Sequence, residues 1–565
     1  MEKKLLNIAI LITLLFIFCT INANTTNDSI LNINKVGPQT EQIDQSIYEK
    51  IFYVSVVTGS NKNGDGSPEN PWQTVFYALS EVKDASDSNH YAVSVAAGIY
   101  DMSTIIMKEY VDLYGGYNPQ TWERDIFEYT TILDGKDVRR VVVGANHSRI
   151  DGFTITHGLG RSHGGGILCE DSSPTISNNF IIENLVLEPD KFNTKRIHQE
   201  GFHGGGIACL YNAVPIIKNN IICGNRTAIG YGGGIVFYGW VRLADAPETR
   251  VIDNVLSGGL HAIVENNVLF GNISGVNDTH DTRSSSGGAI ACAFEACPVI
   301  KNNIILENQA KGRSDAGGIY SEYFSYPLIQ GNWIVGNICD DDGGGIYVMK
   351  LSHTVITENV IAGNWTTGGG VGGIRISKEG RARILKNLIV DNPGGGVRCV
   401  DSYMELVDNI IMHNNKASGL TFSSNFSYMM PSLVKNNVIR ENEVGAISIL
   451  NNAGKTINLA NNNIDEDSTY PQSSNFNKDP GFIDDGIERI VTSINYDNSH
   501  YTTVLIFKES IENREQLPGR LMRLGHFWGV IKETEPGKLV VWGNLSGTKY
   551  INQKFKILPS YKKSK

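Results

Sequence analysis

Proline is scarce in this chain, with 17 residues among 565, and its 60 glycines follow no G-X-Y period, which excludes collagen and a linker-like sequence. Basic residues are in deficit, with 49 Lys and Arg against 59 Asp and Glu. The resulting net charge of -10 argues against a dedicated nucleic-acid binder, because phosphate contacts require clustered cations. The cysteines lack the C-x-x-C spacing of a zinc site. With 41% hydrophobic and 19% charged residues, the composition is that of a folded protein.

Glycine and asparagine are both unusually frequent in this chain. The charge is also unevenly distributed along it. The chain has 60 Gly and 54 Asn, each close to one residue in ten, and only glycine normally comes close to that share. From Tyr501 to Lys565 there are 12 Lys and Arg against 5 Asp and Glu, or +7, which leaves -17 for residues 1–500. We therefore expect an acidic main body followed by a basic C-terminal module.

The N-terminus has the pattern of a secretory signal. Met1-Glu2-Lys3-Lys4 precedes an apolar run from Leu5 to Phe18, and small residues follow up to Ala23, where we expect cleavage. The alternative is an uncleaved anchor, although the run is shorter than the roughly 20 residues of a spanning helix. No later segment is long and apolar enough to span a bilayer. The sequence predicts a signal peptide at residues 1–23, a flexible segment at 24–49, and export to the extracellular space, cell surface or periplasm.

The middle of the chain repeats two short blocks. The first has the form apolar-x-x-Asn-apolar-Ile-x-x-Asn, and successive equivalent asparagines from Asn179 onward are 22 to 47 residues apart. The second is a glycine block followed by an apolar residue, as in Gly204-Gly205-Gly206-Ile207, and its apolar residue precedes the repeat asparagine by 13 residues in four copies. Units of 22 to 28 residues with short alternating apolar runs and no 3.6-residue period predict coils of a parallel β-helix.

Stacked coils explain the composition. Coils about 4.8 Å apart place equivalent residues above one another, so inward asparagines form a hydrogen-bonded ladder and glycines form tight corners. Cys169, Cys209, Cys292 and Cys399 fall in one inward column. We expect them to be buried thiols, with a Cys169–Cys209 disulfide as the alternative.

Several motifs resemble those of exported bacterial right-handed parallel β-helix proteins of the pectin-lyase-like superfamily. They are Tyr53-Val54-Ser55, Gly64-Asp65-Gly66-Ser67, Asn70-Pro71-Trp72, Ala97-Gly98-Ile99-Tyr100, Leu113-Tyr114-Gly115-Gly116-Tyr117, Ile132-Leu133-Asp134-Gly135 and Asp479-Pro480-Gly481-Phe482. The resemblance implies an all-β, single-stranded right-handed parallel β-helix of about ten or more coils. We expect a helical cap and first coils at residues 50–160, repeats at 161–485 and a small basic β module at 486–565. It implies no single activity, because this fold serves many functions.

Outward-facing residues of the coils from Asp315 to Arg398 form the candidate site. If the apolar residue of each glycine block points inward, its neighbours Tyr320, Tyr347, Arg375 and Arg398 point outward. Lys350 and Lys378 lie at the strand ends, and Asp315, Asp341 and Asp342 lie at the rim. The three aspartates are the predicted calcium ligands. Arg375 with Lys378 or Lys350 would be the base, and Tyr320, Tyr347 and Arg398 would bind substrate.

These residue types suit β-elimination at a uronic acid. A cation held by carboxylates neutralises the sugar carboxylate, a basic side chain removes the neighbouring proton, and aromatic rings hold the sugars. The sequence thus predicts a monomeric protein that binds polysaccharide or cell-surface glycan, as a calcium-dependent lyase of acidic polysaccharide. The alternative is a non-catalytic envelope or surface protein whose basic module docks on an anionic surface. Charged residues outside a solenoid also serve solubility alone.

Overall fold

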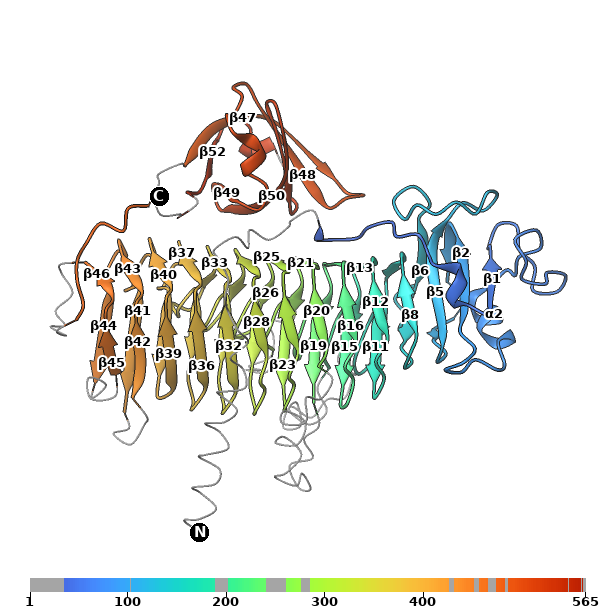
Figure 1. Cartoon of the computed structure of the whole chain (residues 1–565), viewed down its shortest axis with the longest axis horizontal. Helices are drawn as coiled ribbons and strands as arrows, with labels where there is room; N and C mark the ends of the chain where they lie inside the picture. Colours follow the sequence, from blue (N-terminus) through green and yellow to red (C-terminus); the bar gives the residue numbers. More distant parts are fainter. Residues whose placement is uncertain are drawn as a thin grey trace, which may run out of the picture.

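The computed structural model describes residues 35–101, 103–187, 202–239, 261–275, 285–425, 431–451, 457–465, 474–482, 486–546, 548–559 and 561. The predicted signal peptide therefore lies outside the described residues. These residues form a long solenoid of stacked coils, with a small barrel seated on one side (Figure 1). Among them, no helix is long and apolar enough to cross a membrane.

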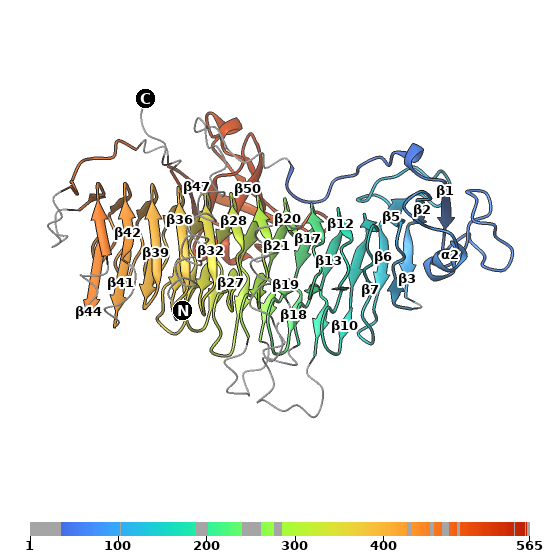
Figure 2. The same ribbon diagram turned by 60° about the horizontal axis from the view of Figure 1, so that its bottom comes forward.

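Four parallel sheets run along the solenoid (Figures 1 and 2). The 14-stranded sheet runs from β1 (Lys50–Val54) to β45 (Ile457–Ala460), and the 13-stranded sheet runs from β3 (Gly98–Tyr100) to β46 (Asn463–Ile464). A seven-stranded sheet runs from β10 (Leu159–Gly160) to β34 (Trp365–Thr366). These sheets confirm the predicted parallel β-helix of ten or more coils.

The 12-stranded sheet carries the candidate site. From β11 to β38 its strands follow the glycine blocks, and each pairs in parallel with the strand of the next coil. The strands are β4 (Ile105–Ile106), β7 (Val142–Val143), β11 (Ile167–Glu170), β15 (Ile207–Leu210), β19 (Ile235–Tyr238), β23 (Ile290–Ala293), β27 (Ile319–Ser321), β31 (Ile346–Val348), β35 (Ile374–Ile376), β38 (Val397–Val400), β41 (Leu420–Ser424) and β44 (Ile447–Asn451).

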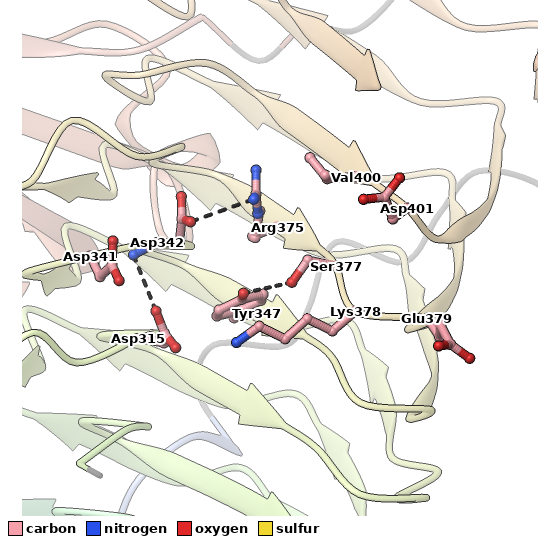
Figure 3. A pocket seen from close by; sticks show the side chains of 10 residues that line it. All are labelled: Asp315, Asp341, Asp342, Tyr347, Arg375, Ser377, Lys378, Glu379, Val400 and Asp401. Carbon is pink, nitrogen blue, oxygen red and sulfur yellow. Dashed lines mark hydrogen bonds and ion pairs between the residues drawn. The ribbon is translucent and has the colours of Figure 1, made fainter. Parts of the chain in front are cut away.

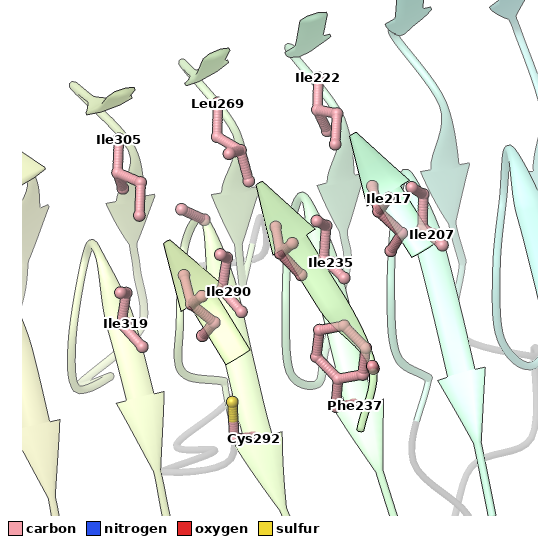
Figure 4. Packing of buried hydrophobic residues seen from close by; sticks show 14 of the residues in the cluster. Ile207, Ile217, Ile222, Ile235, Phe237, Leu269, Ile290, Cys292, Ile305 and Ile319 are labelled. Atoms are coloured by element: carbon pink, nitrogen blue, oxygen red, sulfur yellow. The ribbon is translucent and has the colours of Figure 1, made fainter. Parts of the chain in front are cut away.

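The interior is an apolar column with asparagine ladders at its corners. Isoleucines of successive coils stack on one another, as do Ile207, Ile235 and Ile290 in Figure 4. Oδ1 of Asn220 accepts both the backbone and the side-chain N–H of Asn179, at 2.9 and 3.2 Å. Because the same pattern continues from coil to coil, each buried amide has partners, as the ladder prediction required.

The glycines lie at the predicted close contacts between coils, and the cysteines occupy the predicted inward column. At Gly205 an added Cβ would lie 2.5 Å from the carbonyl oxygen of Gly233 in the next coil, so only glycine allows the coils to stack this closely. Cys169 and Cys209 are in register on β11 and β15, and both are free thiols rather than a disulfide. The cysteine column is therefore part of the apolar core.

The N-terminal end is capped by helix α2 (Val75–Glu81), whose first turn is capped by the Thr74 side chain. Of the predicted flexible segment at 24–49, the structure describes residues 35–49, and its flexibility stays a prediction. These residues run along the solenoid toward this cap (Figure 1) and are fixed by hydrogen bonds from Gly37 N–H to Asn266 O and from Arg124 Nη1 to Glu41 O. We call residues 35–49 the strap.

The C-terminal module is a closed antiparallel barrel. Its strands are β47 (Ile487–Asp497), β48 (Thr502–Phe507), β49 (Leu521–Leu524), β50 (Phe527–Glu535), β51 (Lys538–Trp542) and β52 (Lys554–Ile557). Trp528 and Trp542 of the barrel share one apolar cluster with Trp333 and Leu306 of the 13-stranded sheet. Trp528 lies so close to Gly363 that an added Cβ would be 2.3 Å from its ring. The basic module therefore docks on the protein's own solenoid.

Candidate functional site

Six side chains in successive coils line one edge of the 12-stranded sheet, and we call them the rim column. They are His163, His203, Tyr231, Ser286, Asp315 and Asp342. Each of four members accepts a backbone N–H from the next coil. Nδ1 of His203 accepts from Tyr231 at 2.9 Å, and Oδ1 of Asp315 accepts from Asp342 at 3.3 Å. The rim column is therefore a ladder of side-chain acceptors that ends in two carboxylates.

A pocket of about 570 Å³ opens beside the last two members of the rim column (Figure 3). Asp315, Asp341 and Asp342 form one wall, Tyr347 and Arg375 lie in the centre, and the strand ends form the other wall. The opposite wall consists of Ser377, Lys378, Glu379, Val400 and Asp401. The predicted aspartates, Tyr347, Arg375 and Lys378 thus come from three successive coils to one place.

Asp315 has an unusual charge state for an aspartate. Burial, followed by the nearby charges of Asp341 and Asp342, raises its pKa to about 7. The Lys378 side chain extends back toward this carboxyl and opposes the shift. Near neutral pH, Asp315 can therefore hold or release a proton, as a general acid or base must.

Arg375 and Asp342 face each other across the pocket. Nη2 of Arg375 lies 3.6 Å from Oδ2 of Asp342, and the arginine is only 9% exposed. The hydroxyl groups of Tyr347 and Ser377 are 2.6 Å apart and close the floor beside them. The pocket therefore pairs one proton-holding carboxyl with a second carboxylate that is held by a fixed cation.

Two predicted site residues, Tyr320 and Lys350, are not among the residues that line the pocket. Tyr320 is 3% exposed and donates its hydroxyl to Glu322 at 2.9 Å, so it is not a surface platform for a sugar. Lys350 is an unsuitable base because it lies 2.8 Å from the Glu322 carboxylate. Burial alone lowers the pKa of Lys350, but this ion pair outweighs burial and raises it, so the ammonium stays protonated.

Tyr347 and Arg398 need a smaller correction. Tyr347 borders the pocket as predicted, but it is 3% exposed and forms part of the floor rather than an open stacking surface. Arg398 is next to Arg375 in the register of β35 and β38 but is not part of the pocket wall. Both side chains remain on the outer face of the 12-stranded sheet.

The sequence analysis did not single out Ser377, Glu379, Val400 or Asp401. Ser377 and Val400 are the third residues after the apolar residues of their coils, a position already expected to face outward. Asp401 follows Val400 and accepts a hydrogen bond from the backbone N–H of Asn425 at 2.6 Å. Counting one position beyond β38 would have found Asp401, whereas Glu379 lies three positions beyond the end of β35.

No group of three His, Cys, Asp or Glu side chains is arranged to hold a metal ion in the part of the chain that the structure describes. Asp315, Asp341 and Asp342 line one wall without forming such a group. Calcium binding therefore stays a prediction, and it requires these side chains to rearrange.

Two family descriptions match the sequence. "Right handed beta helix region" matches residues 248–404 and 364–474, and "Protein of unknown function (DUF1565)" matches residues 57–293. None of the curated proteins matches the chain. The family matches agree with the stacked coils of the structure.

Three solved structures resemble the chain at low TM-scores. The GH136 lacto-N-biosidase from Eubacterium ramulus is 12% identical, with 71% of this chain and 68% of that chain covered and a TM-score of 0.32. The tailspike protein of E. coli bacteriophage HK620, in complex with a pentasaccharide, is 10% identical, with coverages of 90% and 94% and a TM-score of 0.27. A tailspike protein from Acinetobacter baumannii bacteriophage Fri1, a capsular polysaccharide depolymerase, is 10% identical, with coverages of 84% and 80% and a TM-score of 0.22. At these TM-scores the likeness identifies no substrate or reaction for this chain.

Proposed function

This chain is a right-handed parallel β-helix repeat protein, and from that premise we propose that its outer pocket binds carbohydrate and cleaves a glycosidic bond with Asp315 as the proton-transferring group. The observation that carries the proposal is the Asp315 carboxyl, whose pKa is raised to about 7 inside an open pocket. A carboxyl group that is protonated near neutral pH can protonate the leaving oxygen of a glycosidic bond.

The second carboxylate of the reaction would be Asp342. Glycosidic bond cleavage commonly uses one protonated and one ionised carboxyl group on either side of the bond. Asp342 forms an ion pair with Arg375 at 3.6 Å, whereas Asp315 forms no ion pair with any described residue. Two neighbouring aspartates, one with a raised pKa and one paired with a cation, therefore match the two roles.

The pocket also has a suitable size and lining for a sugar chain. Its volume of about 570 Å³ lies within the roughly 300–1,000 Å³ of typical ligand sites. Its walls carry hydroxyl, carboxylate and cationic groups that can bind sugar hydroxyls.

The calcium-dependent lyase that the sequence predicts is a second candidate. Arg375 and Lys378 lie in the same pocket as the three aspartates, as elimination requires. In this reaction Arg375 or Lys378 would remove the proton next to a uronate carboxylate. A calcium-dependent rise in absorbance near 235 nm on polyuronates would distinguish elimination from hydrolysis, which produces no unsaturated product.

The test is a polysaccharide panel assayed for new reducing ends, with Asp315→Asn as the variant. We expect turnover on at least one glycan and a loss of about 100-fold or more in the variant. Asp408→Asn, at an exposed turn, is the matched control and should retain activity. Glycan binding without turnover across the panel would overturn the catalytic proposal and favour the non-catalytic surface protein.

A further inference from the structure

Two arginines lie side by side on the outer face of the 12-stranded sheet. Arg375 on β35 and Arg398 on β38 are direct partners in the parallel register, so their side chains leave adjacent coils in the same direction. Like charges at directly opposed positions destabilise a sheet. The arrangement therefore has an electrostatic cost that other interactions must offset.

Protein groups offset this cost only in part. The ion pair with Asp342 at 3.6 Å uses Nη2 of Arg375, while Nε and Nη1 are buried without a hydrogen-bond partner. Nε of Arg398 is likewise buried and unpartnered, and no described residue forms an ion pair or hydrogen bond with Arg398. A buried donor without a partner is costly, and more so when it is charged. Three guanidinium nitrogens thus lack acceptors for their N–H groups.

The pKa of Arg398 reports the same imbalance. Burial lowers it first, and the neighbouring charge of Arg375 lowers it further, while Asp342 only partly opposes the effect. Arg383, another arginine of the solenoid, has a close carboxylate partner. Arg383 on β36 (Arg381–Leu385) has the Glu405 carboxylate 2.7 Å from its Nε.

We propose that Arg375 and Arg398 form a subsite for an oxyanion carried by the carbohydrate ligand, either a carboxylate or a sulfate ester. Guanidinium groups present N–H donors in a planar fork that matches such oxygens, and an oxyanion would satisfy the free donors and separate the two positive charges. The proposal rests on the proposed function and deepens it, because it extends the pocket at Arg375 to the neighbouring Arg398 and names the substrate class.

The subsite also sets the direction of the ligand. Asp315, Asp341 and Asp342 in one wall, and Glu379 and Asp401 in the other, repel an anion, so the charged sugar would lie over the arginines between them. The neighbouring sugar would then lie against Asp315, and the bond between the two sugars would be the one that is cleaved. An acidic sugar next to the cleaved bond is therefore the expected substrate feature.

The test measures thermal shifts of the full-length protein at constant ionic strength with three probes. The probes are glucuronic acid, glucose 6-sulfate and neutral glucose. We expect the anionic sugars to raise the melting temperature more than glucose does, and the stronger of the two identifies the oxyanion. In Arg398→Gln the apparent affinity for that anionic sugar should fall about tenfold or more. In Arg383→Gln, on the 14-stranded sheet, it should be unchanged.

A second readout separates ligand binding from a structural role. Without ligand, Arg398→Gln should melt at the same or a higher temperature than the wild type, because a like-charge contact is removed. A purely structural arginine would lower the melting temperature when replaced. Equal shifts from glucose and the anionic sugars, or equal anion shifts in Arg398→Gln and the wild type, would overturn the subsite.

The outcomes also separate this subsite from the proposed reaction. Anion binding that depends on Arg398, without turnover of any glycan, would leave the subsite standing and remove the catalytic proposal. Turnover of neutral glycans only, with no stronger thermal shift from the anionic sugars than from glucose, would support the catalytic proposal and remove the subsite.

Discussion

The backbone N–H of Asp342 donates a hydrogen bond to Oδ1 of Asp315 at 3.3 Å, which makes the central carboxyl of the pocket part of the rim column as well. Asp315 therefore has a structural role as an acceptor and a chemical role as a titrating group. Asparagine retains the acceptor oxygen but cannot ionise, whereas alanine removes both. Comparing the two substitutions separates the roles.

The titration of Asp315 predicts a pH dependence of stability. Its pKa is raised to about 7 in the folded protein from the ordinary value of 3.8, so between these pH values the folded state binds more protons than the unfolded state. The contribution of Asp315 to the free energy of unfolding should therefore fall as pH rises from about 4 to about 7. Asp315→Asn should lack this contribution. The difference in the free energy of unfolding between the wild type and the variant, measured by urea unfolding at several pH values, should therefore fall over the same pH range.

Asp315→Ala provides the contrast for this measurement. It should also lose the slope, but it should be less stable than Asp315→Asn by about 1 kcal/mol at every pH, because the Asp342 N–H loses its acceptor. A wild-type stability that rises between pH 4 and 7 relative to Asp315→Asn would contradict the assignment.

Gly363 and Gly271 provide a matched test of barrel docking. Both have positive φ angles, +63° and +60°, so alanine is similarly strained at either position. At Gly363 the new Cβ would also lie 2.3 Å from the Trp528 ring, whereas at Gly271 nothing lies within 4 Å. We expect Gly363→Ala to lower the free energy of unfolding by about 2 kcal/mol more than Gly271→Ala.

The measurement combines denaturant unfolding with tryptophan fluorescence. A shift of the native emission in Gly363→Ala toward longer wavelengths would report the loss of Trp528 packing on the 13-stranded sheet. Identical unfolding curves and spectra for the two variants would show that the barrel does not depend on this contact.

Much of the fold could be predicted because the repeats encode it directly. Each glycine block specifies where a coil must pass close to the next, and each repeat asparagine specifies a rung of a ladder. The docking of the barrel could not be predicted, because it depends on the outer surfaces of two units that are distant in the sequence. The aromatic residue Trp528 and the small residue Gly363 are complementary only once the coils are stacked.

The location of the candidate site could be predicted from the sequence, but the burial of its individual side chains could not. Alternation along a strand correctly placed Tyr320, Tyr347 and Arg375 on the outer face. It gives the direction of a side chain but not what covers it, so the burial of Tyr320 beside Glu322 was missed. The Lys350–Glu322 ion pair joins successive coils at adjacent strand-end positions, and the repeat pattern alone does not reveal it.

Arg124 connects three parts of the N-terminal region, so replacing it with a shorter side chain should lower the free energy of unfolding considerably. It is 6% exposed, donates to the carbonyl oxygens of Gly115 and Glu41, and forms a buried ion pair with Asp151. Lysine cannot make these contacts together, so Arg124→Lys should cost about 3 kcal/mol. The strap should also be cut faster, because Glu41 loses its partner.

Limited trypsin digestion at Lys50, followed by mass spectrometry, measures release of the strap. Arg161→Lys, at an exposed position, is the control and should be digested like the wild type. If Arg124→Lys and Arg161→Lys release the strap at equal rates, Arg124 does not hold it.

The asparagine ladder should hold neighbouring coils together. The side chain of Asn308 donates to the carbonyl oxygen of Leu269 at 3.0 Å and to Oδ1 of Asn337 at 2.9 Å, and its own Oδ1 accepts the backbone N–H of Asn272 at 3.0 Å. Asn308→Ala leaves several buried groups without partners, so we expect a loss of about 3 kcal/mol or more in the free energy of unfolding.

The control for this loss is Asn458→Ala, because Asn458 is exposed on β45 and its replacement should change the free energy by less than about 0.5 kcal/mol. Amide hydrogen exchange adds a spatial readout. In Asn308→Ala, protection should fall first in the coils on either side of Asn308 and persist near the ends of the solenoid, because each coil contacts only its neighbours. Uniform loss of protection along all coils would instead show that the solenoid unfolds as one unit and that the ladder acts collectively.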